Sequence, residues 1–362
     1  MLFFGFLFVI FISDLAAQTQ HGDQCTTSDN RNGVCQPLST CAKPEDINVS
    51  ANLCSNEQEP IVCCPESRVS YKKCKLFGRL AYKTYGVTSL SLNPTVVNVT
   101  IPECDHSVPL IVGGEKAKIG EFPHMAALGY KNSDNGKIEF RCGGTLISEH
   151  FILTAGHCLI TQTPVVVRLN EYNMINDSDD AVDYDIEAII KHPSYKPTKS
   201  KYNDIALLKL TTPVSLSKEV RPACLHNTFN IKTNRAVAIG FGKVEFAGDQ
   251  SNELLKVGLD IFPNDECQMY YNDRKLKSGI IDTQICSGYK EGGKDTCEGD
   301  SGGPLQITDP NNQCLYYVIG VTSLGKSCGG ATPAIYTRVS SYLDWIESVV
   351  WPPVQGGGLL LP

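Results

Sequence analysis

One serine of the chain lies in a string that suits nucleophilic chemistry. Ser301 falls within Asp-Thr-Cys-Glu-Gly-Asp-Ser-Gly-Gly-Pro, residues 295–304, where glycines permit a tight turn that exposes the hydroxyl. The backbone amides of Gly299 and Ser301 could then converge as an oxyanion hole, in which losing one donor typically costs ~10²–10³ in turnover. A plain turn would explain a short Gly-x-Ser-x-Gly string, but the longer string with its cysteine is far more specific.

A serine hydroxyl is a weak nucleophile at pH 7 and needs a base. Histidine is the side chain suited to that role near neutral pH. His157 lies in Leu-Thr-Ala-Gly-His-Cys, where a disulfide from Cys158 to nearby Cys142 could lock its position. Asp204 heads an apolar run and is expected to be partly buried, so it needs a partner. Holding the imidazole in one tautomer supplies that partner. A structural histidine and a surface aspartate would be the simpler interpretations if either string stood alone.

A fourth string suggests how such a site could be switched on. Leu110-Ile111-Val-Gly-Gly lies where a polar stretch ends and a β-rich region begins. Cleavage between Leu110 and Ile111 would create an apolar N-terminus with an ammonium group, which can insert and pair with a buried carboxylate. Asp300, next to Ser301, is the candidate carboxylate.

The elements that must position these residues are predicted to be strands. From residue 111 short β-rich runs alternate with turn residues, which favours an all-β sandwich or barrel. A helix is expected near the C-terminus, capped by Ser340 or Ser341, with Leu343, Ile346 and Val350 on one face. Residues 351–362 are expected to form an unstructured tail. The predicted strands are residues 122–130, 145–154, 165–169, 188–191, 205–210, 236–239, 255–261, 316–322 and 334–338.

The segment before this region holds a dense cysteine cluster. Six cysteines within residues 24–65, with few large apolar residues, predict a small module held by three disulfides of ~2–4 kcal/mol each. A zinc site is the alternative, although the adjacent pair Cys63-Cys64 and the lack of a CxxC spacing argue against it. Residues 66–110 are expected to be a polar linker with little regular structure.

The chain start and the composition indicate export. Residues 1–17 are typical of a signal peptide, and the apolar run is too short for a membrane anchor. An even count of 16 cysteines and sequons at Asn48, Asn98 and Asn176 agree with an oxidising, extracellular setting. A net charge of −7 favours neither a nucleic-acid nor a membrane partner.

These strings together resemble the chymotrypsin family of serine proteases. The chain order His157, Asp204, Ser301 matches that family, and the resemblance covers residues 111–350, about two-thirds of the chain. It implies two packed six-stranded antiparallel β-barrels with the active site between them. The N-terminal module resembles the arthropod clip domain, and the combination resembles clip-domain proteases of the snake-like type.

The resemblance also implies a disulfide pattern. One bridge, Cys104–Cys224, would tether the linker to the protease region after cleavage. Parity then suggests a second tether between the two remaining cysteines, Cys74 and Cys314. The other implied pairs are Cys25–Cys63, Cys35–Cys54, Cys41–Cys64, Cys142–Cys158, Cys267–Cys286 and Cys297–Cys328.

Specificity follows from the resemblance as well. Asp295 would lie at the base of the primary pocket, which selects Arg or Lys. Gly325 matches a pocket-wall glycine, and Ser323 the serine behind the triad aspartate. Ala334 stands where glycine is commoner, and its extra methyl is expected to favour arginine, whose guanidinium reaches the carboxylate as a fork.

The activation bond does not suit this pocket, because Leu110 would face Asp295. We therefore expect activation by a different protease that tolerates leucine. The resemblance implies a link in an extracellular cascade, in innate immunity, melanisation or Toll-ligand processing, with a downstream proprotein substrate and a serpin-type inhibitor. Alternatives are a non-catalytic homologue acting as a binding cofactor, and a venom or digestive protease.

No cofactor is required by this chemistry. Glu171, Asn173 and the acidic run 177–180 lie where some relatives bind calcium, and oxygen ligands suit that ion. An acidic surface loop is the simpler interpretation.

Overall fold

The structure is a computed structural model of the 362-residue chain, and it divides into two compact units, Met1–Arg68 and Val69–Pro362. The expected signal peptide, residues 1–17, lies outside the described residues, as does most of the expected tail. The described residues are 21–28, 31–41, 47–56, 58–90, 94–104, 115–175, 180–243, 250–289, 299–309, 312–325 and 332–353.

The first unit is a small disulfide-held sheet. Its four strands follow the order β1-β2-β4-β3, and all neighbours are antiparallel. Three bridges join Cys25 to Cys63, Cys35 to Cys54 and Cys41 to Cys64, the pairs that the sequence led us to expect. The strands are β1 (Gln24–Thr26), β2 (Asn32–Pro37), β3 (Leu53–Asn56) and β4 (Pro60–Pro65), with a 3-10 turn, η1 (Leu38–Thr40).

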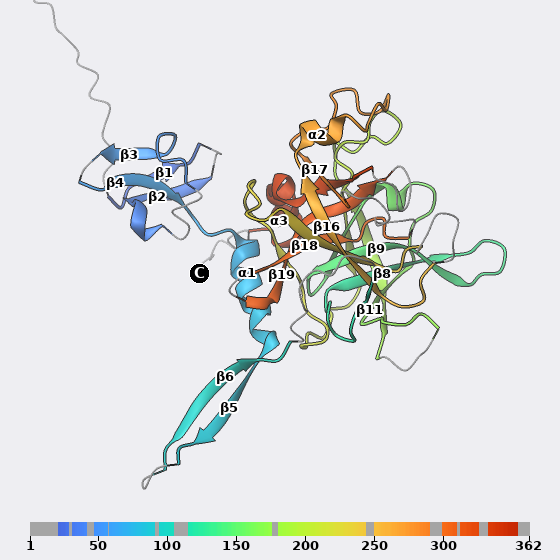
Figure 1. Cartoon of the computed structure of the whole chain (residues 1–362), viewed down its shortest axis with the longest axis horizontal. Coiled ribbons are helices and arrows are strands. Elements are labelled where there is room, and N and C mark those ends of the chain that lie inside the picture. The colour runs from blue at the N-terminus through green and yellow to red at the C-terminus, as the bar shows by residue number, and fades with distance from the viewer. Residues whose placement is uncertain are drawn as a thin grey trace, which may run out of the picture. The chain divides into compact units, whose positions relative to one another are not determined.

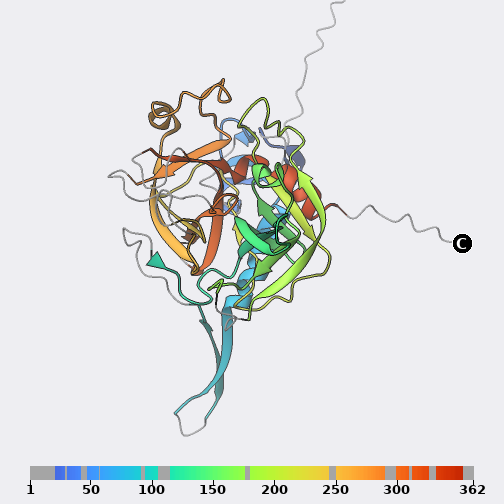
Figure 2. The same cartoon turned by 90° about the vertical axis from the view of Figure 1, so that its right-hand side faces the viewer.

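The segment expected to be an irregular linker is folded, so that prediction was wrong. It forms helix α1 (Val69–Gly78), the 3-10 turn η3 (Arg79–Ala81) and a hairpin of β5 (Tyr82–Thr88) and β6 (Val96–Pro102). Figures 1 and 2 both show this hairpin extending away from the larger sheets. Ser70, Cys74, Phe77 and Gly78 form the buried face of α1, which packs against β14 (Cys224–Leu225).

Two disulfides fix this segment to the second unit, but in pairs other than those expected. Cys74 is bonded to Cys224, and Cys104 to Cys314. The family resemblance implied Cys104–Cys224, and parity then suggested Cys74–Cys314; both expected pairs were wrong. The helix sets Cys74 beside β14, while the end of the hairpin brings Cys104 to the start of β19 (Asn312–Leu324).

The second unit contains two closed six-stranded antiparallel barrels, as the family resemblance implied (Figure 1). The first barrel runs in the order β10-β13-β12-β11-β8-β9. Its core consists of strand residues such as Leu128, Ile152 and Leu207, all without exposed surface. Its strands are β8 (Met125–Lys131), β9 (Ile138–Ser148), β10 (Phe151–Thr154), β11 (Val166–Leu169), β12 (Val182–Lys191) and β13 (Ala206–Leu210). The single run predicted at 145–154 is thus two paired strands.

The second barrel runs β19-β18-β15-β16-β17-β20 and closes through pairing of β19 with β20. Strand β7 (Glu115–Lys116) adds to β16, and β14 joins β19 in parallel. Of the barrel strands, β17 and β18 were not predicted from the sequence. The elements are β15 (Arg235–Gly240), β16 (Leu255–Phe262), α2 (Asn264–Gln268), β17 (Gln284–Gly288), β18 (Pro304–Asp309), β19 and β20 (Ala334–Arg338).

The expected C-terminal helix is present as α3 (Leu343–Val350), after the 3-10 turn η5 (Val339–Tyr342). Leu343, Ile346 and Val350 are buried on one face and join the core of the first barrel. The cap prediction was wrong, because Ser340 and Ser341 lie inside the 3-10 turn and Tyr342 precedes the helix without a side-chain cap. Among the described residues, no helix is long and apolar enough to cross a bilayer.

The two tethers give a prediction about the part of the chain before Leu110, here called the light chain, once the expected cleavage after Leu110 has taken place. Because Cys74–Cys224 and Cys104–Cys314 act independently, the double variant Cys104→Ser/Cys314→Ser should keep the light chain attached after cleavage. Replacing all four cysteines should release it on a non-reducing gel. Mass mapping of unreduced peptides provides the check, and a peptide linking Cys104 to Cys224 would contradict the pairing.

A buried histidine gives a prediction about pH. His124 has 1 % exposed surface and lies 2.5 Å from Gln306 through Nε2 and Oε1. Burial lowers its pKa to about 3, with the charge of Arg221 acting in the same direction and the Gln306 contact opposing. Below about pH 6.5 His124 is protonated in the unfolded chain, whereas in the folded chain it stays neutral until the pH approaches 3. The free energy of unfolding therefore falls as the pH drops from about 6.5 toward 3.

Between pH 7 and 5 this linkage should cost about 2 kcal/mol of unfolding free energy. In guanidinium unfolding, the unfolding free energy of the His124→Gln variant should fall much less between pH 7 and pH 5 than that of the native protein. His192→Gln is the matched control, since His192 is less buried and its pKa is lowered less deeply. An unchanged pH slope in His124→Gln would refute the assignment.

Candidate active site

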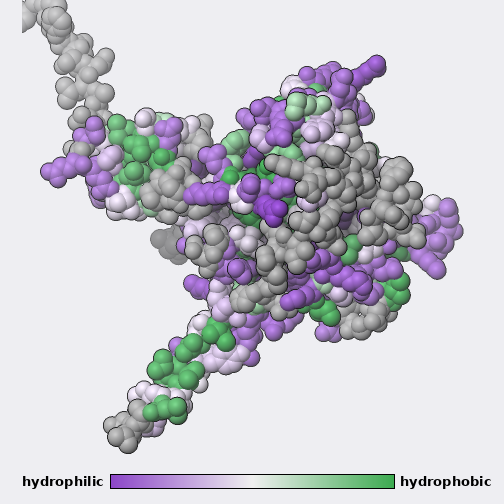
Figure 3. Space-filling model, viewed as in Figure 1, coloured by the Kyte–Doolittle hydropathy of each residue, from purple (hydrophilic) through white to green (hydrophobic). Residues whose placement is uncertain are grey.

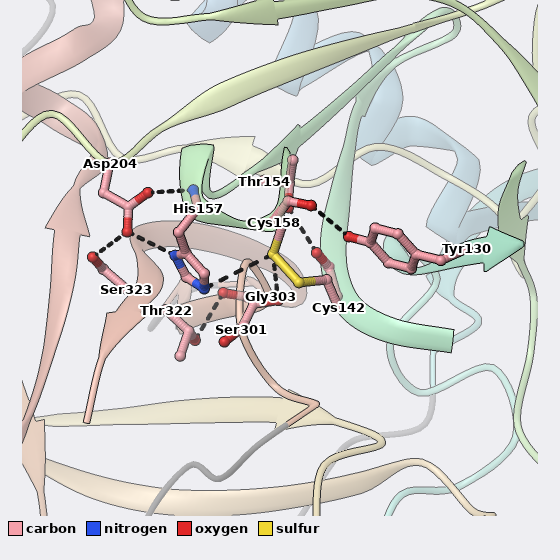
Figure 4. The surroundings of a disulfide bond; sticks show 11 residues. Tyr130, Cys142, Thr154, His157, Cys158, Asp204, Ser301, Gly303, Thr322 and Ser323 are labelled. Atoms are coloured by element: carbon pink, nitrogen blue, oxygen red, sulfur yellow. Dashed lines mark hydrogen bonds and ion pairs between the residues drawn. A yellow bond between two sulfur atoms is a disulfide. The ribbon is translucent and has the colours of Figure 1, made fainter. Parts of the chain in front are cut away.

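Strand pairing brings His157 and Asp204 together. His157 lies in the 3-10 turn η4 (Gly156–Leu159), directly after β10, and Asp204 precedes β13. Because β10 and β13 pair with Thr154 opposite Ala206, the two connections lie side by side. Ser301 comes from the other barrel, in the turn before β18. Figure 4 shows the three side chains gathered around the Cys142–Cys158 disulfide.

His157 forms two hydrogen bonds with one carboxylate, one through its imidazole and one through its backbone. Its Nδ1 lies 2.8 Å from Asp204 Oδ2, and its backbone N–H donates to Oδ1 at 2.8 Å. A carboxylate accepts, so this geometry favours the tautomer with the proton on Nδ1. That tautomer leaves the lone pair of Nε2 available as a base.

Asp204 has 3 % exposed surface and is fully engaged. Burial alone would raise its pKa, but the charge of His157 and hydrogen bonds from His157 and Ser323 outweigh burial and lower it. Ser323 Oγ donates to Oδ2 at 2.5 Å, and Thr337 Oγ1 donates to the Asp204 backbone carbonyl at 2.8 Å. The carboxylate therefore stays ionised although it is buried.

The turn that carries Ser301 is tied to both barrels. Gly143 N–H donates to the Ser301 carbonyl at 2.8 Å, and Gly302 N–H donates to Thr322 at 2.9 Å. Cys158 Sγ lies 3.5 Å from the Ser301 carbonyl oxygen and 4.0 Å from His157 Nε2, so the disulfide contacts both functional residues (Figure 4). Both cysteines belong to the first barrel, so the disulfide provides a surface of that barrel against which the Ser301 turn lies.

Glycine conformations shape this turn. Gly299 has φ 103° and Gly302 φ 77°, which other residues rarely adopt. A Cβ on Gly302 would lie 2.2 Å from Thr154 Oγ1, so the turn also needs the missing side chain for close packing. The expected oxyanion-hole amides of Gly299 and Ser301 belong to this turn.

Asp300 sits against a pair of glycines that sequence reasoning missed. Its Oδ1 accepts a hydrogen bond from Gly242 N–H at 2.8 Å. A Cβ on Gly240 would lie 2.0 Å from Oδ1, and one on Gly242 would lie 2.4 Å from Oδ2. The signal was the Gly-Phe-Gly string that follows a predicted strand. The expected cleavage site, Leu110 and Ile111, lies outside the described residues.

The expected pocket residues are placed only in part. Asp295 lies outside the described residues, as do Cys297 and Cys328 of the expected bridge. Ser323 and Gly325 lie at and just beyond the end of β19, and Ala334 begins β20 with 1 % exposed surface. Of these, Ser323 directly contacts the site through Asp204. Two bridges of the second unit, Cys142–Cys158 and Cys267–Cys286, have the expected partners.

The described residues give no independent metal site. Two groups of potential ligands occur among them, Cys25-Cys35-Cys54 and Cys142-His157-Cys158, and all their cysteines are in disulfides. Glu171 is buried and its Oε2 lies 3.2 Å from Arg168 Nη1. Residues 176–179, which include the sequon Asn176, lie outside the described part, so the calcium site stays a prediction.

Two sequons lie in described segments. Asn48 is exposed, and its Oδ1 accepts a hydrogen bond from Ala51 N–H at 3.2 Å. Asn98 is exposed on β6.

Two barrels that share a histidine–aspartate pair and a serine turn define a serine protease of the two-barrel class. Comparison with known proteins agrees: the family model described as Trypsin matches residues 111–346. The chain belongs to the trypsin family of serine proteases. The relatives and the disulfide-rich N-terminal unit further identify it as a clip-domain member.

Three relatives illustrate the likeness. Serine protease snk of Drosophila melanogaster is 40 % identical over 89 % of this chain and 77 % of its own length. Venom serine protease Bi-VSP of Bombus ignitus is 34 % identical over 95 % of this chain and 96 % of its own length. CLIP domain-containing serine protease B10 of Anopheles gambiae is 34 % identical over 90 % of this chain and 93 % of its own length.

The Ser323–Asp204 contact gives a prediction for the activated protein. Ser323→Ala should lower kcat on the order of tenfold, because a hydrogen bond to a buried charge is lost, and should change KM little. Ser287→Ala is the matched control, since its hydroxyl donates to the Asp260 carbonyl at 2.9 Å, away from Asp204. Steady-state kinetics on a peptide substrate provides the measurement. A change confined to KM would instead place Ser323 in substrate binding.

Proposed function

We propose that the chain is the zymogen of an active, secreted serine endopeptidase with Ser301 as its nucleophile. The observation that carries this is the continuous arrangement Ser323–Asp204–His157, with the Ser301 turn held against the same disulfide. Family membership alone would also fit a non-catalytic homologue. The presence of Ser301 together with a hydrogen-bonded His157 and an ionised Asp204 supports the active form.

In the proposed mechanism each residue has one role. His157 Nε2 takes the proton of Ser301 Oγ as the hydroxyl attacks the substrate carbonyl, and later gives it to the leaving amine. Asp204 stabilises the imidazolium that forms and keeps the ring oriented. The amides of Gly299 and Ser301 stabilise the oxyanion of the tetrahedral intermediate. Water then repeats the attack on the acyl-enzyme.

Activation would follow from cleavage of Leu110–Ile111. The new ammonium group of Ile111 would pair with Asp300, which already lies beside Gly240 and Gly242. Asp300 is joined to both Gly299 and Ser301, so its position affects the oxyanion hole directly. The activity would therefore depend on the cleavage.

The substrate would be cut after arginine in preference to lysine. Asp295 supplies the carboxylate in this proposal, and buried Ala334 narrows the pocket. Because Leu110 does not suit Asp295, another protease that tolerates leucine would activate the zymogen. The protein would thus be a middle link of an extracellular cascade, with a downstream proprotein as substrate and a serpin-type inhibitor.

One relative favours a second setting. The match to a protein named as a venom serine protease extends over 95 % of this chain, so venom use is an alternative location for the same chemistry. Detection of the protein in venom rather than in body fluid would favour it.

The proposal predicts a conditional, arginine-directed activity. After cleavage at Leu110 by pancreatic chymotrypsin, Ser301 should react with a fluorophosphonate, and paired peptides should be cut faster after Arg than after Lys. Ser301→Ala provides the control for labelling. Labelling without turnover of any peptide, or comparable Arg and Lys rates, would contradict the activity or the preference respectively.

The same preparation tests dependence on another protease. Purified zymogen incubated alone should not acquire an Ile111 N-terminus, because its own pocket disfavours leucine. Sequencing of the N-termini over time gives the result. Autonomous cleavage at Leu110–Ile111 would remove the case for an upstream activator.

A further inference from the structure

The hairpin between the clip module and the protease has one polar and one apolar face. Its register places Tyr85 opposite Val99, and Val87 opposite Val97, with Ile101 on the same face. These five residues, here called the apolar face, are each between 38 % and 55 % exposed. Green apolar residues are visible along the hairpin in Figure 3.

The opposite face has a different character. Thr84 pairs with Thr100 through a 2.8 Å hydroxyl contact, and Gly86 lies opposite Asn98. The sequon at Asn98 thus lies on the polar face. A glycan at that position would keep the polar face in solvent and leave the apolar face accessible.

The hairpin is anchored at its base, and its apolar face is bordered by Lys83, which lies opposite Ile101 and holds its Nζ 5.3 Å from the centre of the Tyr85 ring. Glu103 N–H donates to the Ala81 carbonyl at 2.7 Å, and Cys104–Cys314 pins the strand end to β19. Tyr85 OH donates to Glu103, whose carboxylate also pairs with Lys218 at 3.8 Å. An isolated two-stranded hairpin is marginal in water, and an exposed apolar patch on a defined element indicates an interaction surface.

We propose that this apolar face is the docking surface for the protease that cuts Leu110–Ile111. This rests on the proposed activation at that bond. The partner required is a leucine-tolerant protease with an apolar surface patch beside its own active-site cleft. Only five residues lie between Cys104 and Leu110, so the six steps along the chain limit their distance to ~20 Å.

The length of the hairpin allows one partner to contact both the apolar face and the Leu110–Ile111 bond. Each hairpin strand is seven residues long, or about 23 Å. A protease domain of ordinary size is on the order of 40 Å across. A protease with its active site on Leu110–Ile111 can therefore reach the apolar face.

Leucine at the cut bond makes such a surface useful. An apolar pocket separates similar side chains by only ~10–200-fold, so the scissile residue alone gives limited selectivity between activators. A second copy of this chain is a weaker candidate, because five half-exposed side chains offer less than the ~800 Å² per partner of a stable dimer.

The test compares the two faces of the hairpin. Val87→Thr/Val97→Thr makes the apolar face polar while keeping β-branched residues. Val96→Thr is the matched control, because Val96 lies on the polar face and is more exposed, at 68 %. Full-length zymogens are exposed to extracellular fluid of the source animal, and the appearance of the Ile111 N-terminus is timed.

We expect Val87→Thr/Val97→Thr to be activated on the order of tenfold more slowly by the fluid, and Val96→Thr within twofold of the native rate. Pancreatic chymotrypsin, used as a reference, should cut Leu110 in all three at equal rates. Equal rates in the fluid overturn the docking surface, as does equal slowing with chymotrypsin. A native dimer in sedimentation that the double variant abolishes reassigns the face to a second copy.

Different outcomes of the same experiment would refute the proposed function, on which the docking surface rests. If the fluid cuts the native zymogen at a bond other than Leu110–Ile111, the proposed activation is wrong. If cleavage at Leu110 yields no peptidase activity, the proposed enzyme is wrong, while the rates at Leu110 still decide the role of the hairpin.

Discussion

The buried carboxylate of Asp204 is the constraint on which the site depends. An ionised group with 3 % exposed surface is costly unless it is paired and hydrogen-bonded. Here the cost is offset by His157 and Ser323, and the carboxylate thereby fixes both the position and the tautomer of the imidazole. His157 belongs to the first barrel and Ser323 to the second. The imidazole is therefore oriented correctly only when the two barrels pack together.

A second carboxylate connects the site to processing of the chain. Asp300 follows Gly299 and precedes Ser301, so the residue that would receive the new N-terminus is covalently part of the nucleophile turn. Gly240 and Gly242 leave room for its side chain and for nothing larger on their own backbone. A change in the position of Asp300 would reach the oxyanion hole and the nucleophile directly, because Gly299 and Ser301 are its neighbours in the chain.

Sequence reasoning reached the chemistry more readily than the connections. His157, Asp204 and Ser301 lie in strings whose composition reflects local demands, such as glycines at a tight turn. The barrels themselves came from family resemblance, since a run of short strands fits a sandwich equally well. Strands β17 and β18 were missed because each has one side occupied by polar or small residues that interrupt the apolar pattern. The Gly240–Gly242 contact was missed because it joins residues about sixty positions apart.

The segment 69–104 shows why the disulfide pairs went wrong. A helical signal was present, since Ser70, Cys74, Phe77 and Gly78 recur at helical spacing. The segment was still interpreted as a linker because of its scattered Ser and Thr residues, its Asn93-Pro94 pair and its sequon. Once that segment is folded, the reach of each cysteine is set by a rigid element rather than by a flexible chain: Cys74 is confined to the helix face on β14, and Cys104 to the hairpin base. Two independent disulfides hold this segment to the second unit, one at α1 and one at the base of the hairpin.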